Sequence, residues 1–165
     1  MTASVPLPRP SAPLPSPTPA DILGLLGSVH DPEIPAISIV DLGIVERAEV
    51  TADGRIEVEL LPTFVGCPAL DVIRGSVEAA LAPLGRDASV AFTWCVPWTS
   101  DRITEAGRSA LAAVGFAPPA EPGEVRCPYC RSERVVMDSA FGPTQCRSLF
   151  YCRSCRQPFE AFKPI

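Results

Sequence analysis

Four cysteines in the C-terminal part of the sequence have the spacing of a metal site. They form two Cys-x-x-Cys pairs separated by 21 residues: Cys127 with Cys130, and Cys152 with Cys155. Each pair on a tight turn points two sulfurs at one place, and two such turns complete a tetrahedron around zinc. A segment of this size buries too little apolar surface to fold alone, so metal is expected to stabilise it. The spacing predicts a zinc ribbon over residues 124–165. Iron instead of zinc, or paired disulfides instead of metal, are the alternatives.

Cys67 is the main candidate for a working thiol outside that segment. It lies in the sequence Gly66-Cys67-Pro68, at the start of a helix predicted over residues 67–81. The positive end of a helix dipole favours thiolate over thiol, so this position predicts a lowered pKa and a reactive or metal-binding cysteine. Burial as a small apolar side chain is the alternative.

Cys95 and Cys146 are less well defined by their neighbours. Cys95 ends a predicted strand, and burial within that strand is the simplest role for it. Cys146 is a fifth cysteine inside the predicted ribbon. Three roles fit it: an alternative ligand in place of one of the four, a free thiol facing the rest of the chain or a partner, or a filler of the small ribbon core.

The elements that must position these thiols follow from the hydrophobic pattern. A helix is predicted to begin at Pro19, with Thr18 and Asp21 as its capping signal. Further helices are predicted over residues 67–81 and 104–114, and strands over 44–51, 55–61 and 88–95. This α-β-β-α-β-α order predicts a two-layer α+β domain over residues 20–116.

The order of elements also brings two cysteines together. Strands 55–61 and 88–95 flank a helix, so they are expected to be parallel and joined right-handed. Their carboxyl ends then meet at one edge of the sheet, where ligand sites of such units gather. Cys67 and Cys95 are both expected at that edge.

A proline-containing loop over residues 30–43 carries three acids, Asp31, Glu33 and Asp41. Carboxylates at this place can bind a metal or support a neighbouring ligand. Solvated turn formers are the alternative.

Proline and charge divide the chain into parts. Seven of the 20 prolines fall within residues 1–19, which predicts a disordered tail, and a proline-rich linker is predicted over residues 117–123. The net charge of −5 divides into −8 over residues 1–122 and +3 over residues 123–165. A basic ribbon is compatible with nucleic-acid binding, but the acidic body opposes it.

The composition excludes several classes of protein. Hydrophobic residues make up 47% of the chain, which excludes disorder as a whole, and no stretch approaches the ~20 apolar residues of a membrane span. The single histidine excludes a multi-histidine metal site. No nucleophile triad or phosphate loop is present, so an enzyme with its own turnover is not expected. The lack of an export signal predicts a cytoplasmic protein with reduced thiols.

Four segments and the ribbon together resemble known families. The segments are Asp31-Pro-Glu-Ile-Pro35, Ser38-Ile-Val-Asp-Leu-Gly-Ile44, Pro62-Thr-Phe-Val-Gly-Cys-Pro68 and Trp98-Thr-Ser-Asp101. They resemble the iron–sulfur assembly domain of the SufT and metal-sulfur cluster biosynthesis family. With the ribbon included, residues 20–165 are similar to the PaaD (PaaJ) family, small accessory subunits encoded with phenylacetyl-CoA epoxidase.

The resemblance implies a site around Cys67. That thiol would hold iron or an iron–sulfur cluster transiently, supported by Asp31 and Thr63. Two departures from the family pattern stand out. Phe64-Val65 occupies the place of a frequent tyrosine–serine pair, and Cys95 stands where the family usually has no cysteine, which makes a two-cysteine site a local feature of this chain.

The resemblance also implies a role in phenylacetate catabolism. By this resemblance the protein is expected to be a maturation factor of the epoxidase rather than an enzyme, with structural zinc in the ribbon and with the reductase and oxygenase subunits as clients. A homodimer is one assembly that would complete the Cys67 site. The alternative is a non-catalytic structural subunit of the epoxidase complex that carries only zinc.

Overall fold

The computed structural model of the protein describes residues 16–64, 66–121 and 123–165. Within them the chain forms three α-helices and two sheets, of three and four strands. The predicted proline-rich tail lies outside the described residues as far as residue 15. None of the helices in the described part is long and apolar enough to cross a membrane.

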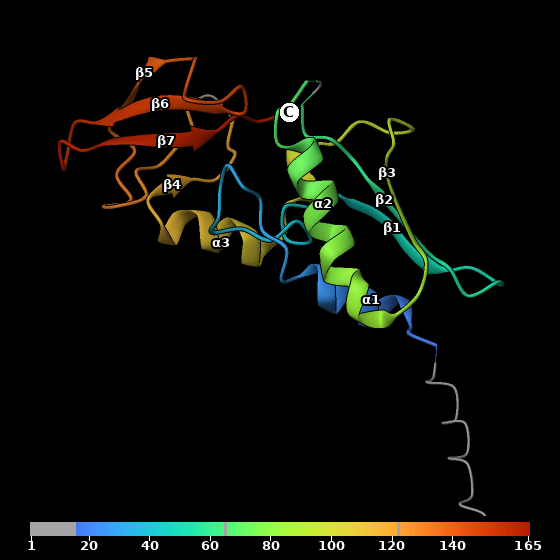
Figure 1. The fold of residues 1–165 in the computed structure, drawn as a ribbon. Coiled ribbons are helices and arrows are strands. Elements are labelled where there is room, and N and C mark those ends of the chain that lie inside the picture. Colours follow the sequence, from blue (N-terminus) through green and yellow to red (C-terminus); the bar gives the residue numbers. More distant parts are fainter. Residues whose placement is uncertain (1–15, 65, 122) are drawn as a thin grey trace, which may run out of the picture.

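The first half of the protein contains a three-stranded sheet (Figure 1). Its order is β1-β2-β3, where β1 is Val45–Val50, β2 is Ile56–Leu60 and β3 is Ala88–Phe92. Strands β1 and β2 are antiparallel and joined by a tight turn in which Gly54 has φ of +85°, a conformation open to glycine. Strands β2 and β3 are parallel. The pairing inferred from the strand–helix–strand order is confirmed.

Two helices pack against one face of this sheet. Helix α1 (Pro19–Leu26) begins with the predicted capping box, in which Thr18 and Asp21 each accept the other's backbone N–H. Helix α2 (Leu70–Leu81) contacts α1 and β3. The shared core contains Ile22 and Leu26 of α1, Ile73, Val77 and Leu81 of α2, and Ile56, Val58 and Leu60 of β2. The opposite face of β1 and β2 carries ion-paired charges, so sheet and helices form the two predicted layers.

Two 3-10 helices and a third α-helix complete this half of the chain. The 3-10 helices are η1 (Ala82–Leu84) and η2 (Ser100–Arg102), and the α-helix is α3 (Glu105–Ala113). The hydroxyl of Thr104 accepts the backbone N–H of Gly107 at 3.0 Å, so the predicted cap of α3 is confirmed.

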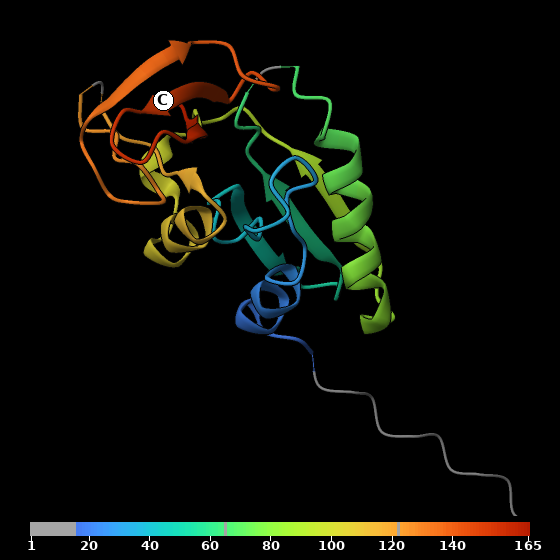
Figure 2. The same cartoon turned by 90° about the vertical axis from the view of Figure 1, so that its left-hand side faces the viewer.

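The second sheet contains the four strands of the C-terminal half. They are β4 (Phe116–Ala117), β5 (Val135–Ser139), β6 (Arg147–Cys152) and β7 (Pro158–Phe162). Their order is β4-β7-β6-β5, with β4 parallel to β7 and the other pairs antiparallel. Figures 1 and 2 place this sheet beside α3 and apart from the first sheet. Strand β4 is too short to show a sequence period, and it was not predicted.

An aromatic cluster joins the second sheet to the first half of the chain. The ring of Phe162, at the end of β7, lies 5.7 Å from the ring of Trp98 and 6.4 Å from that of Phe116. Trp98 is fixed in turn, because its indole N–H donates to the carbonyl of Leu42 at 3.0 Å. Phe116 and Phe162 belong to the same buried core as α1 and α2. The ribbon therefore packs into the core of the first half. The domain division at residues 117–123 stays a prediction.

Replacing the phenylalanine at the centre of this cluster tests that shared core. Phe162→Ala is expected to lower the free energy of unfolding by about 3–5 kcal/mol, because it removes a buried ring and leaves a cavity. Phe141→Ala is the matched control: Phe141 is 83% exposed, so the expected change is about 0.5 kcal/mol. Urea unfolding of both variants measures the difference. Equal effects would contradict the shared core.

Candidate functional site

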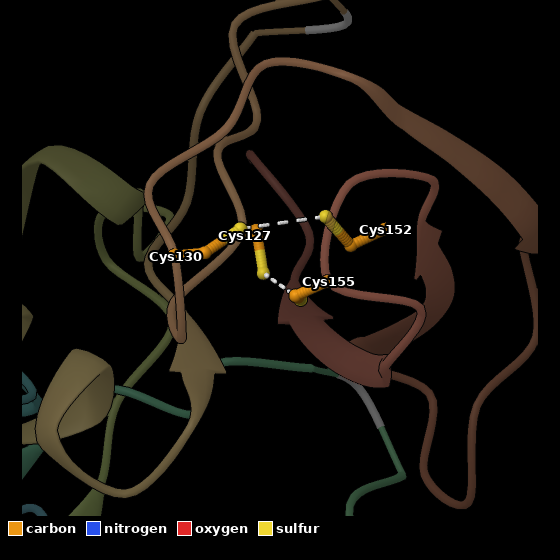
Figure 3. Close-up of side chains that lie close together, drawn as sticks. All are labelled: Cys127, Cys130, Cys152 and Cys155. Carbon is orange, nitrogen blue, oxygen red and sulfur yellow. Dashed lines mark hydrogen bonds between the residues drawn. The ribbon is translucent and has the colours of Figure 1, made fainter.

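The four predicted ribbon ligands converge on one point (Figure 3). Their sulfur atoms all lie within 4.8 Å of one another, and the Cys127–Cys155 and Cys130–Cys152 sulfur pairs are each 3.6 Å apart. Tetrahedral zinc with Zn–S bonds of about 2.3 Å needs sulfurs about 3.8 Å apart, whereas a disulfide needs about 2.05 Å. The arrangement fits a four-thiolate zinc site. Among the described residues no other histidine, cysteine and acid side chains gather as closely.

Each cysteine pair lies on the same kind of turn. Arg131 directly follows the first pair with φ of +59°, and Arg156 follows the second with φ of +61°. Each donates its backbone N–H, at 2.8 Å, to the carbonyl of the first cysteine in its own pair. Left-handed backbone at this position closes the turn and leaves both sulfurs on its inner side. The two turns therefore have the same backbone conformation, and each contributes two sulfurs to the tetrahedral site.

Four sulfurs this close have different proton affinities. Backbone N–H groups of Cys155 and Ser154 lower the pKa of Cys152 to about 6, whereas burial raises the pKa of Cys155 to about 12. Burial also raises the pKa of Cys127. A divalent cation at the centre would neutralise the thiolates and hold all four deprotonated. The donor set therefore fits a cation better than it fits four free thiols.

A second site is a cleft of about 340 Å³ between the two halves of the protein. Cys67, Asp31 and Thr63 line it from the first half, so the structure brings this predicted group together, and Glu33 joins them. The opposite wall is the ribbon turn that precedes β6 and carries Cys146. Figure 2 shows this turn beside the segment that connects β2 to α2.

The predicted lowering of the Cys67 pKa is wrong. Helix α2 begins at Leu70, so Cys67 lies in the turn before the helix and not in its first turn. Burial raises the pKa of the Cys67 thiol, and the charges of Asp31, Cys146 and Glu33 raise it further. The backbone N–H of Ala69 opposes this only in part. Cys67 is half-buried and holds its proton more firmly than a free cysteine.

Asp31 orders the loop beside this thiol. Its side chain is buried, and one carboxylate oxygen accepts the backbone N–H groups of Glu33 at 2.8 Å and Ile34 at 2.9 Å. Burial raises the pKa of Asp31, and the two hydrogen bonds lower it in part. Asp41 does not line the cleft. It accepts the hydroxyl of Thr104 at 2.7 Å and thereby holds the start of α3.

The structure separates the two undecided cysteines. Strand β3 ends at Phe92, and Cys95 beyond it is exposed, so its predicted burial in the strand is wrong. Cys95 does not line the cleft that contains Cys67. Cys146 stands outside the four-sulfur group and lines that cleft instead. Local sequence carries no signal for this position, because it depends on how the ribbon packs against the first half.

Arg147 fastens the ribbon to the loop of Asp31. Its guanidinium donates to the backbone carbonyl of Glu33 and, at 2.8 Å, to the carboxylate of Glu160. It also lies over the ring of Phe116, 5.4 Å from the ring centre. In the sequence, Arg147 is distinguished only by its contribution to the positive charge of residues 123–165. In the structure it fixes one wall of the cleft.

Comparison with known proteins identifies the family. Residues 113–163 match the family described as "PaaD zinc beta ribbon domain", and residues 19–92 match "Iron-sulfur cluster assembly protein". The D subunit of the "Putative 1,2-phenylacetyl-CoA epoxidase" of Escherichia coli is 37% identical in an alignment of 153 residues that covers 88% of this chain and 92% of that protein. The chain belongs to the PaaD family.

Shorter relatives match about half of this PaaD-family chain. The "Fe-S protein maturation auxiliary factor YitW" of Bacillus subtilis is 36% identical over 93 residues, which are 55% of this chain and 90% of that protein. The "Fe-S protein maturation auxiliary factor SufT" of Staphylococcus aureus is 36% identical over 85 residues, 50% of this chain and 96% of that protein. A solved structure of "Domain of Unknown Function DUF59" from Bacillus anthracis has a TM-score of 0.53 at 25% identity, covering 56% of this chain and 90% of that one.

Zinc content tests the ligand set of the PaaD-family ribbon. The purified protein is expected to hold one zinc per chain, and to lose it as acid protonates the thiolates. Cys130→Ser is expected to lose the metal, because a structural zinc site needs all four ligands. Cys146→Ser is the matched control and should retain it. Elemental analysis decides, and zinc lost from the control but kept by Cys130→Ser would refute the assignment.

Alkylation by iodoacetamide tests the raised pKa of Cys67. Because the thiolate is the reactive form, the zinc-loaded protein should react at Cys67 more slowly than glutathione at neutral pH. The rate should reach half its maximum above the ordinary cysteine pKa of about 8.5. Asp31→Asn removes one negative neighbour and should speed the reaction, while Cys67→Ala assigns the signal. A rate that levels off below that pH would contradict the raised pKa.

Proposed function

We propose that this protein is a cytoplasmic accessory factor of a phenylacetyl-CoA epoxidase system, and that it helps to load iron centres into the other subunits. The clients are the reductase, for an iron–sulfur cluster, or the oxygenase, for a di-iron site. The observation that carries the proposal is the cleft in which Cys67, Asp31 and Thr63 meet. Cys67 and its neighbours lie in the part that matches the iron–sulfur cluster assembly family, and 88% of the chain is similar to the Escherichia coli epoxidase protein described above.

Transient binding follows from the chemistry of Cys67. Thiolates are soft ligands suited to iron and its clusters, so the side chain can take up iron as cargo. Its raised pKa means that a proton competes with iron for the sulfur. Iron binding at Cys67 therefore depends on pH and releases a proton. That property suits delivery better than storage.

The ribbon has a different task in this proposal. Its four cysteines hold structural zinc. Its surface docks on the client, and the net charge of +3 over residues 123–165 favours an acidic partner surface. The phenylacetate pathway would use the protein before the epoxidase acts, during its assembly.

Complementation of a gene deletion tests the proposal. Epoxidase reductase and oxygenase are purified from deletion cells that express the wild-type protein, Cys67→Ser or Cys95→Ser, and their iron and acid-labile sulfide are measured. Loss of Cys67 should lower occupancy of a client about tenfold, as expected when a metal-binding group is impaired. Cys95→Ser should support full occupancy, since Cys95 is exposed and outside the cleft.

Two outcomes would contradict the proposal. Full iron and sulfide in both client proteins from deletion cells would end the maturation role. Co-purification of the protein with the epoxidase at a fixed ratio, with zinc as its only metal and unaffected by Cys67→Ser, would establish the alternative of a structural subunit.

A further inference from the structure

Cys146 faces the cleft from the ribbon side and is held there by several contacts. Its carbonyl accepts the backbone N–H of Lys163 at 2.9 Å, just beyond the end of β7. Its sulfur lies 3.1 Å from the hydroxyl of Thr144. It packs against the main core of the protein together with Cys67, and not against the core of the ribbon. Both the backbone and the sulfur of Cys146 therefore have defined positions.

The turn that carries Cys146 is itself firmly built. Gly142 donates its N–H to the carbonyl of Arg147 at 3.0 Å, and Arg147 donates its own N–H to the carbonyl of Thr144 at 3.1 Å. A Cβ at Gly142 would lie 2.7 Å from the Cβ of Arg147, so the chain is packed as closely as glycine allows. Because the guanidinium of Arg147 reaches the carbonyl of Glu33, the turn and the acid loop are locked together. The distance between the two cleft walls is thus set by the fold.

Cys67 and Cys146 line the same cleft from opposite walls, beside Asp31 and Glu33. The charge of Cys146 is close enough to raise the pKa of Cys67, and Asp31 and Glu33 act in the same direction. All four groups line one cleft. Two thiols and two carboxyl groups around one partly enclosed space are a set of donors for a single cation. The cleft is therefore suited to a cation with a preference for sulfur.

The two thiol sites of the protein differ in how complete they are. The ribbon offers four sulfurs, which saturate a tetrahedral metal and close the site. The cleft offers two, which leaves the other coordination positions to ligands that arrive with the cargo or belong to the client. A metal held by two protein ligands can enter and leave the cleft by exchange of its other ligands. A site that delivers metal to a client needs this exchange.

We propose that Cys146 is the second thiolate ligand, with Cys67, of the iron that the protein carries in this cleft. This rests on the proposed delivery function. Binding involves no redox step: Fe(II) forms two Fe–S bonds and displaces two thiol protons to solvent. The two ligands come from the parts of the chain matched by different family models, residues 19–92 and 113–163. The ribbon thus contributes a ligand as well as a zinc-stabilised fold.

Phenylarsine oxide tests the spacing of the pair without any substitution. This reagent bridges two neighbouring thiols, and in the zinc-loaded full chain the ribbon cysteines are protected by metal. One bridge per chain is expected, with peptide mapping locating it at Cys67 and Cys146. Cys95→Ser should give the same result as the wild type. Wild-type protein that takes up no arsenical, or a bridge at another pair, would overturn the proposal.

Anaerobic titration with Fe(II) tests the ligand role. In zinc-loaded Cys146→Ser the dissociation constant for Fe(II) should rise by at least about tenfold. Loss of a residue that only supports a metal ligand already costs about that much in affinity. Cys146→Ala is measured beside it, and unchanged zinc content and thermal unfolding show that each variant is folded. Cys67→Ser should have the same effect, and Cys95→Ser none.

The pattern of losses separates this proposal from the one it rests on. Iron binding lost in Cys67→Ser but retained in both Cys146 variants would overturn the second ligand and leave the delivery function in place. Iron binding retained in all variants would overturn both. Loss in Cys67→Ser and in the Cys146 variants alike supports both.

Discussion

Four sulfur atoms confined within 4.8 Å are the constraint on which the rest of this structure depends. Several thiolates at that spacing repel one another, and a ribbon of this size has a small apolar core with which to compensate. A bound cation changes repulsion into attraction and fixes both turns at once. Strands β6 and β7 adjoin the second of those turns, and they carry the side chains that meet the first half of the protein. Metal at one end of the ribbon therefore controls geometry at the other.

The contact between the two halves turns two small folds into one site. Phe162 enters the core beside Trp98, and Arg147 reaches the loop of Asp31. The buried ring of Phe162 and the guanidinium of Arg147 both connect the ribbon to the first half. Movement of one cleft wall would therefore disturb packing at the other. Without the ribbon, the first half of this chain would lack the cleft wall that residues 141–146 form. Here the same thiol lies in a cleft with a second wall.

Sequence reasoning succeeded where the signal is local and failed where it depends on distant partners. The caps at Thr18 and Thr104, the strand pairing and the four ribbon cysteines could all be inferred from short-range patterns. The start of α2 was misplaced because Pro68 suits a first helical turn as well as the turn before it. The place of Cys146 could not be inferred, since it requires the packing of β7 against the first half.

The parallel pairing of β4 with β7 means that the second sheet can form only after β7 has been synthesised. Strand β7 lies between β4 and β6, and its last residue, Phe162, seals the junction. During translation Asp31 and Cys67 leave the ribosome early. The opposite wall of the cleft, which residues 141–146 form, cannot pack in place until residue 162 has left the exit tunnel. A nascent or truncated chain would therefore expose Cys67 without its second wall.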